Sequence, residues 1–402
     1  MYCLTMKDIN KYKTVTEVIE GYLKVEEASK ILKLSERQIY RIKKRVEREG
    51  IKGILHKSRG VNRARWLTQD IQDKAVHLYD TKYKGFNITH VTEYLNTEEK
   101  IKISKESLRQ ILMCRGLHTR SKRRPKHLQW REPRAREGQM IQFDTSDHDW
   151  LEGRGPRLYL IGGIDDATSA CPGARFALSD SCSENMVVLK QIVETKGIPL
   201  SFYCDRDSKF KTTRHEGLHY QLKGDYGQTQ IARALNELGV EIVYAYSPQA
   251  KGRVERAWGT FQDRLCSELR LHKVSTLQAA NRYLTKVFIP KYNRKFARLP
   301  REKGSAYRAL PKDSDLSNIF CIKEERTVAS DNTISYHAKT YQILPGNNRI
   351  SFVRAKVMVH RHLDGSIHIF LKEQKLRHKQ VHKNNQKASL LVGGNMLTVD
   401  VV

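Results

Sequence analysis

The chain has 402 residues, with 73 lysines and arginines against 44 aspartates and glutamates and a formal net charge of +29 at pH 7. This length exceeds one ordinary hydrophobic core, so we expect roughly two to four domains. No run of about 18 apolar residues is present to span a bilayer, and the N-terminal MYCLTMKDINKYK lacks a signal-peptide core. The positive charge favours a polyanionic partner, with nucleic acid ahead of a membrane surface.

The cysteines are seven in number and scattered, without a Cys-x-x-Cys pair or a His/Cys spacing suited to structural zinc. We therefore expect reduced thiols and a cytoplasmic protein.

Residues 24–50 have the pattern of a helix-turn-helix within a first domain that we expect at 1–60. Ser35 is expected to cap the second helix, with Gln38 completing a capping box. The inward positions of the two helices are Val25, Ala28, Ile31, Leu32, Ile39, Ile42 and Val46.

The outward face of this second helix is rich in cations and hydrogen-bond donors. Such a helix matches the element that enters a DNA groove in helix-turn-helix proteins, although a solvated charged helix in a bundle is the alternative. The candidate DNA-binding residues are Arg37, Gln38, Tyr40, Arg41, Lys43 and Lys44.

A second helical domain is expected at 61–117, with helix caps at Thr68 and Ser104. DNA contact and plain packing remain equally open for it. Residues 118–137 then form a basic linker, broken by two prolines, in which Arg123 and Arg124 are candidate DNA contacts.

From residue 138 to 305 strand and helix patterns alternate, as in a mixed α/β sheet of five strands. Helices are expected at 184–196, 229–238 and from 250 onward. The expected strands are 140–144, 157–165, 173–178, 198–205 and 240–247.

The remainder of the chain predicts a small antiparallel β-barrel at 318–380 and a loosely ordered tail at 381–402. The barrel prediction depends on short strand patterns separated by Asp-Asn, Pro-Gly and Asp-Gly turns.

Three acids follow apolar runs at the ends of expected elements: Asp144, Asp205 and Glu255. Carboxylates without histidine or cysteine favour hard cations such as Mg²⁺ or Mn²⁺, and two such ions can catalyse displacement at a phosphodiester. From the pattern alone, surface or structural carboxylates are an equal alternative.

The segments MIQFDTSDHDWLEGRGPRLYLIGGIDDATS, FYCDRDSKF and SPQAKGRVERAWGTFQDRLCSELRL resemble the catalytic core of DDE transposases and retroviral integrases, most closely the ISNCY-type insertion-sequence transposases. The resemblance covers nearly the whole chain. It implies an N-terminal helix-turn-helix, an RNase H-like (integrase) core with a mixed five-stranded sheet, and a C-terminal β-barrel, as in phage Mu transposase.

By this resemblance the catalytic and metal-binding triad is Asp144, Asp205 and Glu255, with two Mg²⁺ or Mn²⁺ ions. Asp207 is a rival to Asp205, because the chain reads Cys-Asp-Arg-Asp where integrases have Thr-Asp-Asn-Gly. The basic residues around the glutamate are expected to hold DNA phosphates; these are Lys251, Arg253 and Arg256.

Other acids and histidines near these segments are expected in turns or at the surface rather than on a metal. They are Asp147, Asp149, Asp165, Asp166, His148, His215 and His219.

The resemblance implies a bacterial DNA transposase that binds terminal inverted repeats, cleaves 3′ ends and joins them to target DNA as a homo-multimer, with no membrane partner. It would be cytoplasmic, and nucleoid-associated when bound to double-stranded DNA. The alternatives are another RNase H-like Mg²⁺-dependent nuclease and a transposase-derived DNA-binding regulator.

Overall fold

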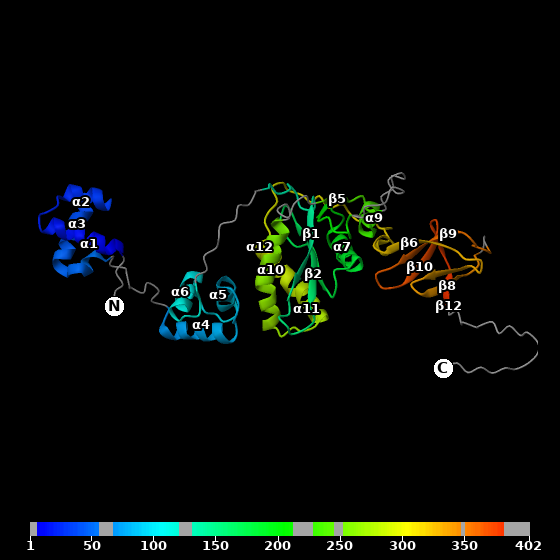
Figure 1. Ribbon diagram of the computed structural model, residues 1–402, viewed down its shortest axis with the longest axis horizontal. Coiled ribbons are helices and arrows are strands. Elements are labelled where there is room, and N and C mark those ends of the chain that lie inside the picture. The colour runs from blue at the N-terminus through cyan, green and yellow to red at the C-terminus, as the bar shows by residue number, and fades with distance from the viewer. Residues whose placement is uncertain are drawn as a thin grey trace, which may run out of the picture. The chain divides into compact units, whose positions relative to one another are not determined.

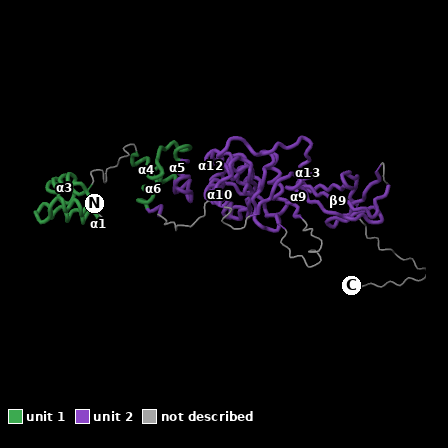
Figure 2. Tube along the Cα trace, turned by 90° about the horizontal axis from the view of Figure 1, so that it is seen from above, with its two compact units in different colours: residues 1–78, 95–115 green, residues 79–94, 116–402 purple. Residues whose placement is uncertain are grey.

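The computed structural model describes residues 6–55, 67–119, 131–211, 228–244, 252–346 and 350–381. The chain divides into two compact units, residues 1–78 with 95–115 and residues 79–94 with 116–402 (Figure 2). We call these unit 1 and unit 2. No helix within the described ranges is long and apolar enough to cross a membrane.

The regular elements between residues 6 and 114 are all helical (Figure 1). Its elements are α1 (Met6–Ile19), α2 (Val25–Leu32), α3 (Glu36–Glu49), the 3₁₀ turn η1 (Gly50–Ile54), α4 (Gln69–Thr81), α5 (Ile88–Thr97) and α6 (Lys105–Cys114). The boundary between the two units falls within α4 and α5.

Helices α1 and α2 pack against the apolar face of α3, as the periodicity of α3 predicts. Ile39, Ile42 and Val46 are all buried, and Ala28 of α2 packs in the same cluster as Ile39. The helix-turn-helix prediction is therefore confirmed in outline, because α3 presents one apolar stripe to α1 and α2.

Two details of that prediction are wrong. Ile31 is 60% exposed rather than inward, since the buried face of α2 is centred on Ala28. Ser35 precedes α3 with extended backbone, but its side chain accepts no capping hydrogen bond. At α6, by contrast, Ser104 caps as expected and accepts from the Ser107 amide at 3.0 Å.

Unit 2 is built on a five-stranded sheet with the order β3-β2-β1-β4-β5. Strands β1 to β3 pair antiparallel, whereas β1, β4 and β5 are parallel neighbours. The bounds are β1 (Ile141–His148), β2 (Leu158–Asp165), β3 (Gly173–Ala177), β4 (Ser201–Cys204) and β5 (Glu241–Tyr244). The predicted mixed sheet is thus confirmed.

Helices cover both faces of this sheet (Figure 1). On one face α7 (Cys182–Lys196) and α9 (Gln230–Glu237) pack on Ile141 and Phe143. The other face carries α10 (Gly252–Leu271), α11 (Leu277–Tyr283), the π-helical turn η3 (Leu284–Phe288) and α12 (Ile289–Phe296).

The C-terminal strands form two antiparallel sheets, β11-β10-β9-β6 and β12-β8-β7, after the short helix α13 (Leu316–Ile319). Among the described strands neither sheet closes, so the expected barrel is not confirmed. The two sheets share one apolar core, which includes Ile334 of β7 and Val359 of β9. The bounds are β6 (Ile322–Thr327), β7 (Thr333–Tyr336), β8 (Lys339–Ile343), β9 (Lys356–Arg361), β10 (Ile367–Leu371), β11 (Gln374–Leu376) and β12 (His378–Val381).

Candidate functional site

Two of the three predicted acids belong to neighbouring parallel strands. Ile141 pairs with Phe202 and Gln142 with Tyr203, and extending this register by two residues aligns Asp144 with Asp205. Asp144 lies within β1 and Asp205 is the first residue after β4; both are half-buried. The register of the sheet therefore places these two residues at neighbouring positions of the chain trace.

The third acid, Glu255, lies on α10, the helix that covers the face of β1 on which the Asp144 side chain lies. The Val254 amide donates to Gln142 Oε1 at 3.1 Å, and Gln262 Nε2 donates to Ser146 Oγ at 3.0 Å. Because side chains alternate along a strand, Gln142, Asp144 and Ser146 share one face, so Asp144 lies on the side covered by α10. Glu255 is exposed in the first turn of α10, beside Val254.

A buried carboxylate, Asp166, fixes the beginning of this helix. It is fully buried and accepts from Gln142 Nε2 at 2.7 Å and from the Arg134 amide at 2.8 Å. It also forms ion pairs with Arg131 and, at 2.9 Å, with Arg253. We call this set the Asp166 hub.

The Asp166 hub gives Arg253 a partner inside the protein. Burial lowers the pKa of Arg253 below its ordinary value, and the Asp166 charge opposes this change. Arg253 therefore anchors the start of α10, which is a role that its prediction as a phosphate contact did not include. Arg256 is exposed and donates from Nε to the Gly252 carbonyl at 2.7 Å.

Asp207, the rival to Asp205, is engaged elsewhere. Its carboxylate pairs with Lys209 at 3.2 Å and accepts from the Lys209 amide at 3.1 Å. Burial raises the pKa of Asp207, but these bonds and the Lys209 charge outweigh burial, so its pKa is lowered overall. Lys209 also pairs with Asp180, which accepts from Thr145 Oγ1 of β1 at 3.0 Å.

The remaining acids near β1 and β2 have structural partners. Asp147 pairs with Arg157 at the surface, and Asp149 accepts from the Gly153 amide at 3.2 Å within a turn. Asp165 is buried and accepts from the Gly138 and Thr168 amides; burial raises its pKa and these bonds oppose the rise. Asp147 and Asp149 thus lie as expected, whereas Asp165 and Asp166 are buried and not at the surface.

The predicted DNA-reading residues of α3 lie mostly in solvent. Lys43 is the exception, because it is half-buried and its ammonium donates to the Val18 carbonyl at 3.4 Å. The exposed ones are Arg37, Gln38, Tyr40, Arg41 and Lys44. Arg123, Arg124, Lys251, His215, His219 and the end of the tail at 382–402 lie outside the described residues.

One Cys/His group in the described part of the chain has a spacing compatible with a metal: the ligand atoms of Cys321, His360 and His362 lie within 4.8 Å of one another. However, His360 Nδ1 and His362 Nε2 both converge on Asn318 Oδ1, at 3.1 and 2.9 Å. Burial, together with the Lys323 charge, lowers the pKa of His360 to about 4. Neutral imidazoles that donate to Asn318 explain this group without an ion.

The sequence did not reveal that Gln142 and Asp166 hold the start of α10 against β1. Gln142 stands among Met140, Ile141 and Phe143 in an otherwise apolar strand, and it is fully buried. A buried amide requires partners, so an isolated glutamine in such a strand is the signal that could have identified it.

Comparisons with known proteins agree with the helix-turn-helix and identify the family. Residues 12–73 match the family model described as "Winged helix-turn helix". The chain is 30% identical over 403 residues to "Putative transposase y4bF" of Sinorhizobium fredii (strain NBRC 101917 / NGR234), covering 97% of this chain and 87% of the relative. It is 28% identical over 400 residues to the transposase for insertion sequence IS1202 of Streptococcus pneumoniae, covering 90% and 84%.

Among solved structures, the chain matches one in a simian T-cell lymphotropic virus intasome in complex with the PP2A regulatory subunit B56 gamma. The sequence identity is 12% and the TM-score 0.33, with 75% of this chain and 98% of that chain covered. The similarity along nearly the full length of both curated relatives shows that this chain belongs to the transposases of insertion sequences.

Proposed function

We propose that the chain binds the terminal inverted repeats of an insertion sequence, cleaves the 3′ ends and joins them to target DNA, with Asp144, Asp205 and Glu255 as the catalytic carboxylates. The observation that carries the proposal is the register of β1 and β4, which aligns Asp144 with Asp205 beneath the helix that bears Glu255. In this view unit 2 contains an RNase H-like core.

The donor set fits hard divalent cations. All three side chains offer carboxylate oxygens, which Mg²⁺ and Mn²⁺ prefer, and two such ions would lower the charge barrier to an in-line displacement at phosphorus. The carboxylates of Asp144, Asp205 and Glu255 would hold the ions, with two of them on β1 and at the end of β4 and the third on α10. Asp207 is the weaker candidate, since its ion pair with Lys209 already uses its charge.

Basic residues supply the contacts to DNA. The exposed cations of α3, Arg37, Arg41 and Lys44, are suited to phosphates and base edges in a groove. Arg256 in the first turn of α10 lies next to Glu255 in sequence and is exposed, so it is the best-placed described cation for a phosphate at the metal site. From the sequence we also propose phosphate contacts for three further cations, Lys251, Arg123 and Arg124. A homo-multimer of the chain would hold the two ends of the element together.

The test is a joining assay with terminal-repeat DNA, target DNA and Mg²⁺ or Mn²⁺. Asp144→Asn, Asp205→Asn and Glu255→Gln remove one ligand charge each with little change in shape. We expect each to lower end joining at least about a hundredfold while repeat binding in a gel-shift assay is retained, because the lost carboxylate charge would hold an ion at the reacting phosphate and not the DNA itself.

Asp147→Asn is the matched control, because Asp147 is on the same strand but pairs with Arg157 in solvent. It should join ends as the wild type does. Triad variants that join ends at the wild-type rate would refute the site. Nicking without joining by the wild type would favour a nuclease, and repeat binding without either reaction would favour a regulator.

A further inference from the structure

Residues 79–94, which precede the basic linker, are part of unit 2 rather than of the helical unit around them. Their side chains are buried to a degree typical of a core: Tyr83 and Val91 are fully buried, and Phe86 is 3% exposed. Phe86 stacks on His90 with ring centroids 4.8 Å apart. This segment is therefore a folded component of the unit.

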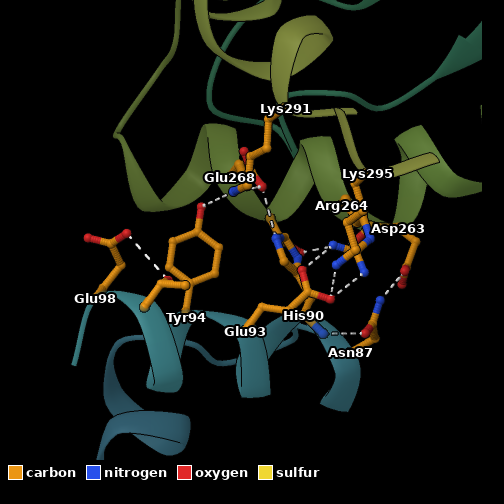
Figure 3. A network of polar contacts seen from close by, with 12 residues as sticks. Asn87, His90, Glu93, Tyr94, Glu98, Asp263, Arg264, Glu268, Lys291 and Lys295 are labelled. Carbon is orange, nitrogen blue, oxygen red and sulfur yellow. Dashed lines mark hydrogen bonds and ion pairs between the residues drawn. The ribbon is translucent and has the colours of Figure 1, made fainter. Parts of the chain in front are cut away.

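Its polar contacts centre on Glu268 of α10 (Figure 3). The carboxylate is 1% exposed and lies 2.9 Å from Nε2 of His90, which is itself fully buried. Lys291 of α12 donates to the same oxygen at 2.8 Å, and the Tyr283 hydroxyl donates to the other at 2.7 Å. Lys291 also donates to the Tyr94 hydroxyl at 3.1 Å. We call this set the Glu268 hub.

A second row of contacts lies alongside it (Figure 3). Arg264 binds both carboxylate oxygens of Glu93, at 2.8 and 3.1 Å. Asn87, whose side chain caps the first turn of α5 by accepting from the His90 amide at 2.8 Å, also bonds to Asp263. Residues 79–94 thus contact Asp263, Arg264 and Glu268 in the second half of α10, and the Lys84 carbonyl accepts from Arg270 of the same helix at 2.7 Å.

These contacts give α10 two buried faces of different chemistry. The face toward the sheet is apolar and includes Phe261, Leu265 and Leu269. The other includes Arg264 and Glu268, four residues apart on one side of the helix, at 7% and 1% exposure. A helix that only had to cover the sheet would leave such charges in solvent, so the second face is built to receive residues 79–94.

From this arrangement we infer that residues 79–94 belong to the catalytic machinery, and that Glu268 is a positioning residue which holds the far end of α10 through them. The inference rests on the proposed function, since α10 carries Glu255. Glu268 follows Glu255 by 13 residues (268 − 255), which corresponds to about 20 Å along one rigid helix. The Asp166 hub holds the beginning of that helix, and the Glu268 hub holds its end.

The test uses the full-length Glu268→Gln variant, which keeps the side-chain shape and removes the charge that His90 and Lys291 share. Hydrogen exchange without DNA should become at least about tenfold faster for amides in 88–94 and in the last turns of α10. At saturating repeat DNA the joining rate should fall at least about tenfold, whereas the half-saturating DNA concentration should stay within about twofold.

Glu194→Gln is the matched control, because Glu194 pairs with Lys190 at the surface of α7 in the same unit. It should leave both measurements unchanged. If Glu268→Gln does not fold, Tyr283→Phe removes one bond to the same carboxylate and should show the same pattern at smaller size.

The possible outcomes distinguish a failure of the inference about Glu268 from a failure of the proposed DNA-joining function. Unchanged exchange in 88–94 would overturn the contact, and faster exchange with an unchanged rate at saturating DNA would overturn the positioning role. If the wild type joins no DNA, the proposed function fails, while the exchange of α10 still decides whether Glu268 holds that helix.

Discussion

Two buried carboxylates hold α10, and they do so with different chemistry. Asp166 is surrounded by two guanidinium groups, those of Arg131 and Arg253, together with the amide of Gln142. Glu268 is surrounded by one ammonium, one phenol and one imidazole. The carboxylate at the beginning of the helix thus pairs with two guanidinium groups, whereas the one at its end pairs with an ammonium and hydrogen-bonds to a phenol and an imidazole.

The direction of the pKa shifts at the Glu268 hub defines its charge state. Burial raises the pKa of Glu268, but hydrogen bonds from His90, Lys291 and Tyr283 outweigh burial and bring it to about 2. Burial lowers the pKa of His90, and the bond to Glu268 only partly opposes this. At neutral pH the pair is therefore a carboxylate that accepts from the Nε2–H of a neutral imidazole.

The largest effect is expected on removing the Asp166 carboxylate. Asp166→Ala removes a fully buried acceptor that Gln142, Arg253 and the partly exposed Arg131 share, so the free energy of unfolding should fall by about 3 to 5 kcal/mol. Urea denaturation measures it. Asp147→Ala, which breaks the exposed pair with Arg157, should leave the free energy of unfolding nearly unchanged, because water screens that pair. Equal losses in the two variants would show that burial of the pair is unimportant.

A second effect, of about 3 kcal/mol, is expected at the Glu268 hub in acid. A carboxylate with a lowered pKa stabilises the fold above its ordinary pKa, 4.5, and this contribution is lost as the pH falls toward its folded pKa of about 2. The buried His90, whose pKa is lowered from 6.5, adds to this loss. As the pH falls below 6.5, the imidazole takes up a proton in the unfolded chain before it does so in the folded one, which favours the unfolded state.

The measurement is the free energy of unfolding of the wild type and of Glu268→Gln as a function of pH. The difference between them should be largest near neutral pH and shrink by about 3 kcal/mol between pH 4.5 and pH 2. A difference that stays constant over this range would contradict the lowered pKa.

The contrast between the hubs also shows where sequence reasoning works. The five strands of the sheet and the inward stripe of α3 were predictable, because each depends on a local alternation of apolar and polar residues. Asp144 and Asp205 could be proposed together for the same reason, since both follow apolar strand patterns.

The hubs could not be predicted, because their partners are far apart in sequence. His90 and Glu268 are separated by 178 positions, and neither carries a local pattern that names the other. Asp166 follows a strand, so the sequence predicts a turn or surface position for it, although its partners come from the linker, β1 and α10. The division of the C-terminal strands into two sheets likewise depends on pairings between distant strands.

The smallest effect that still separates the hubs is expected for Gln142→Met. Methionine keeps the length of the side chain but cannot accept from the Val254 amide or donate to Asp166, so the free energy of unfolding should fall by about 1 to 3 kcal/mol.

The same Gln142→Met variant should also affect the reaction. Because Gln142 lies two residues from Asp144 and contacts the residue before Glu255, the rate of end joining at saturating DNA should fall more than the affinity for repeat DNA. Hydrogen exchange should rise in the first turns of α10 and remain unchanged at 88–94, which the Glu268 hub holds; a rise at both ends would mean that the two hubs are not independent.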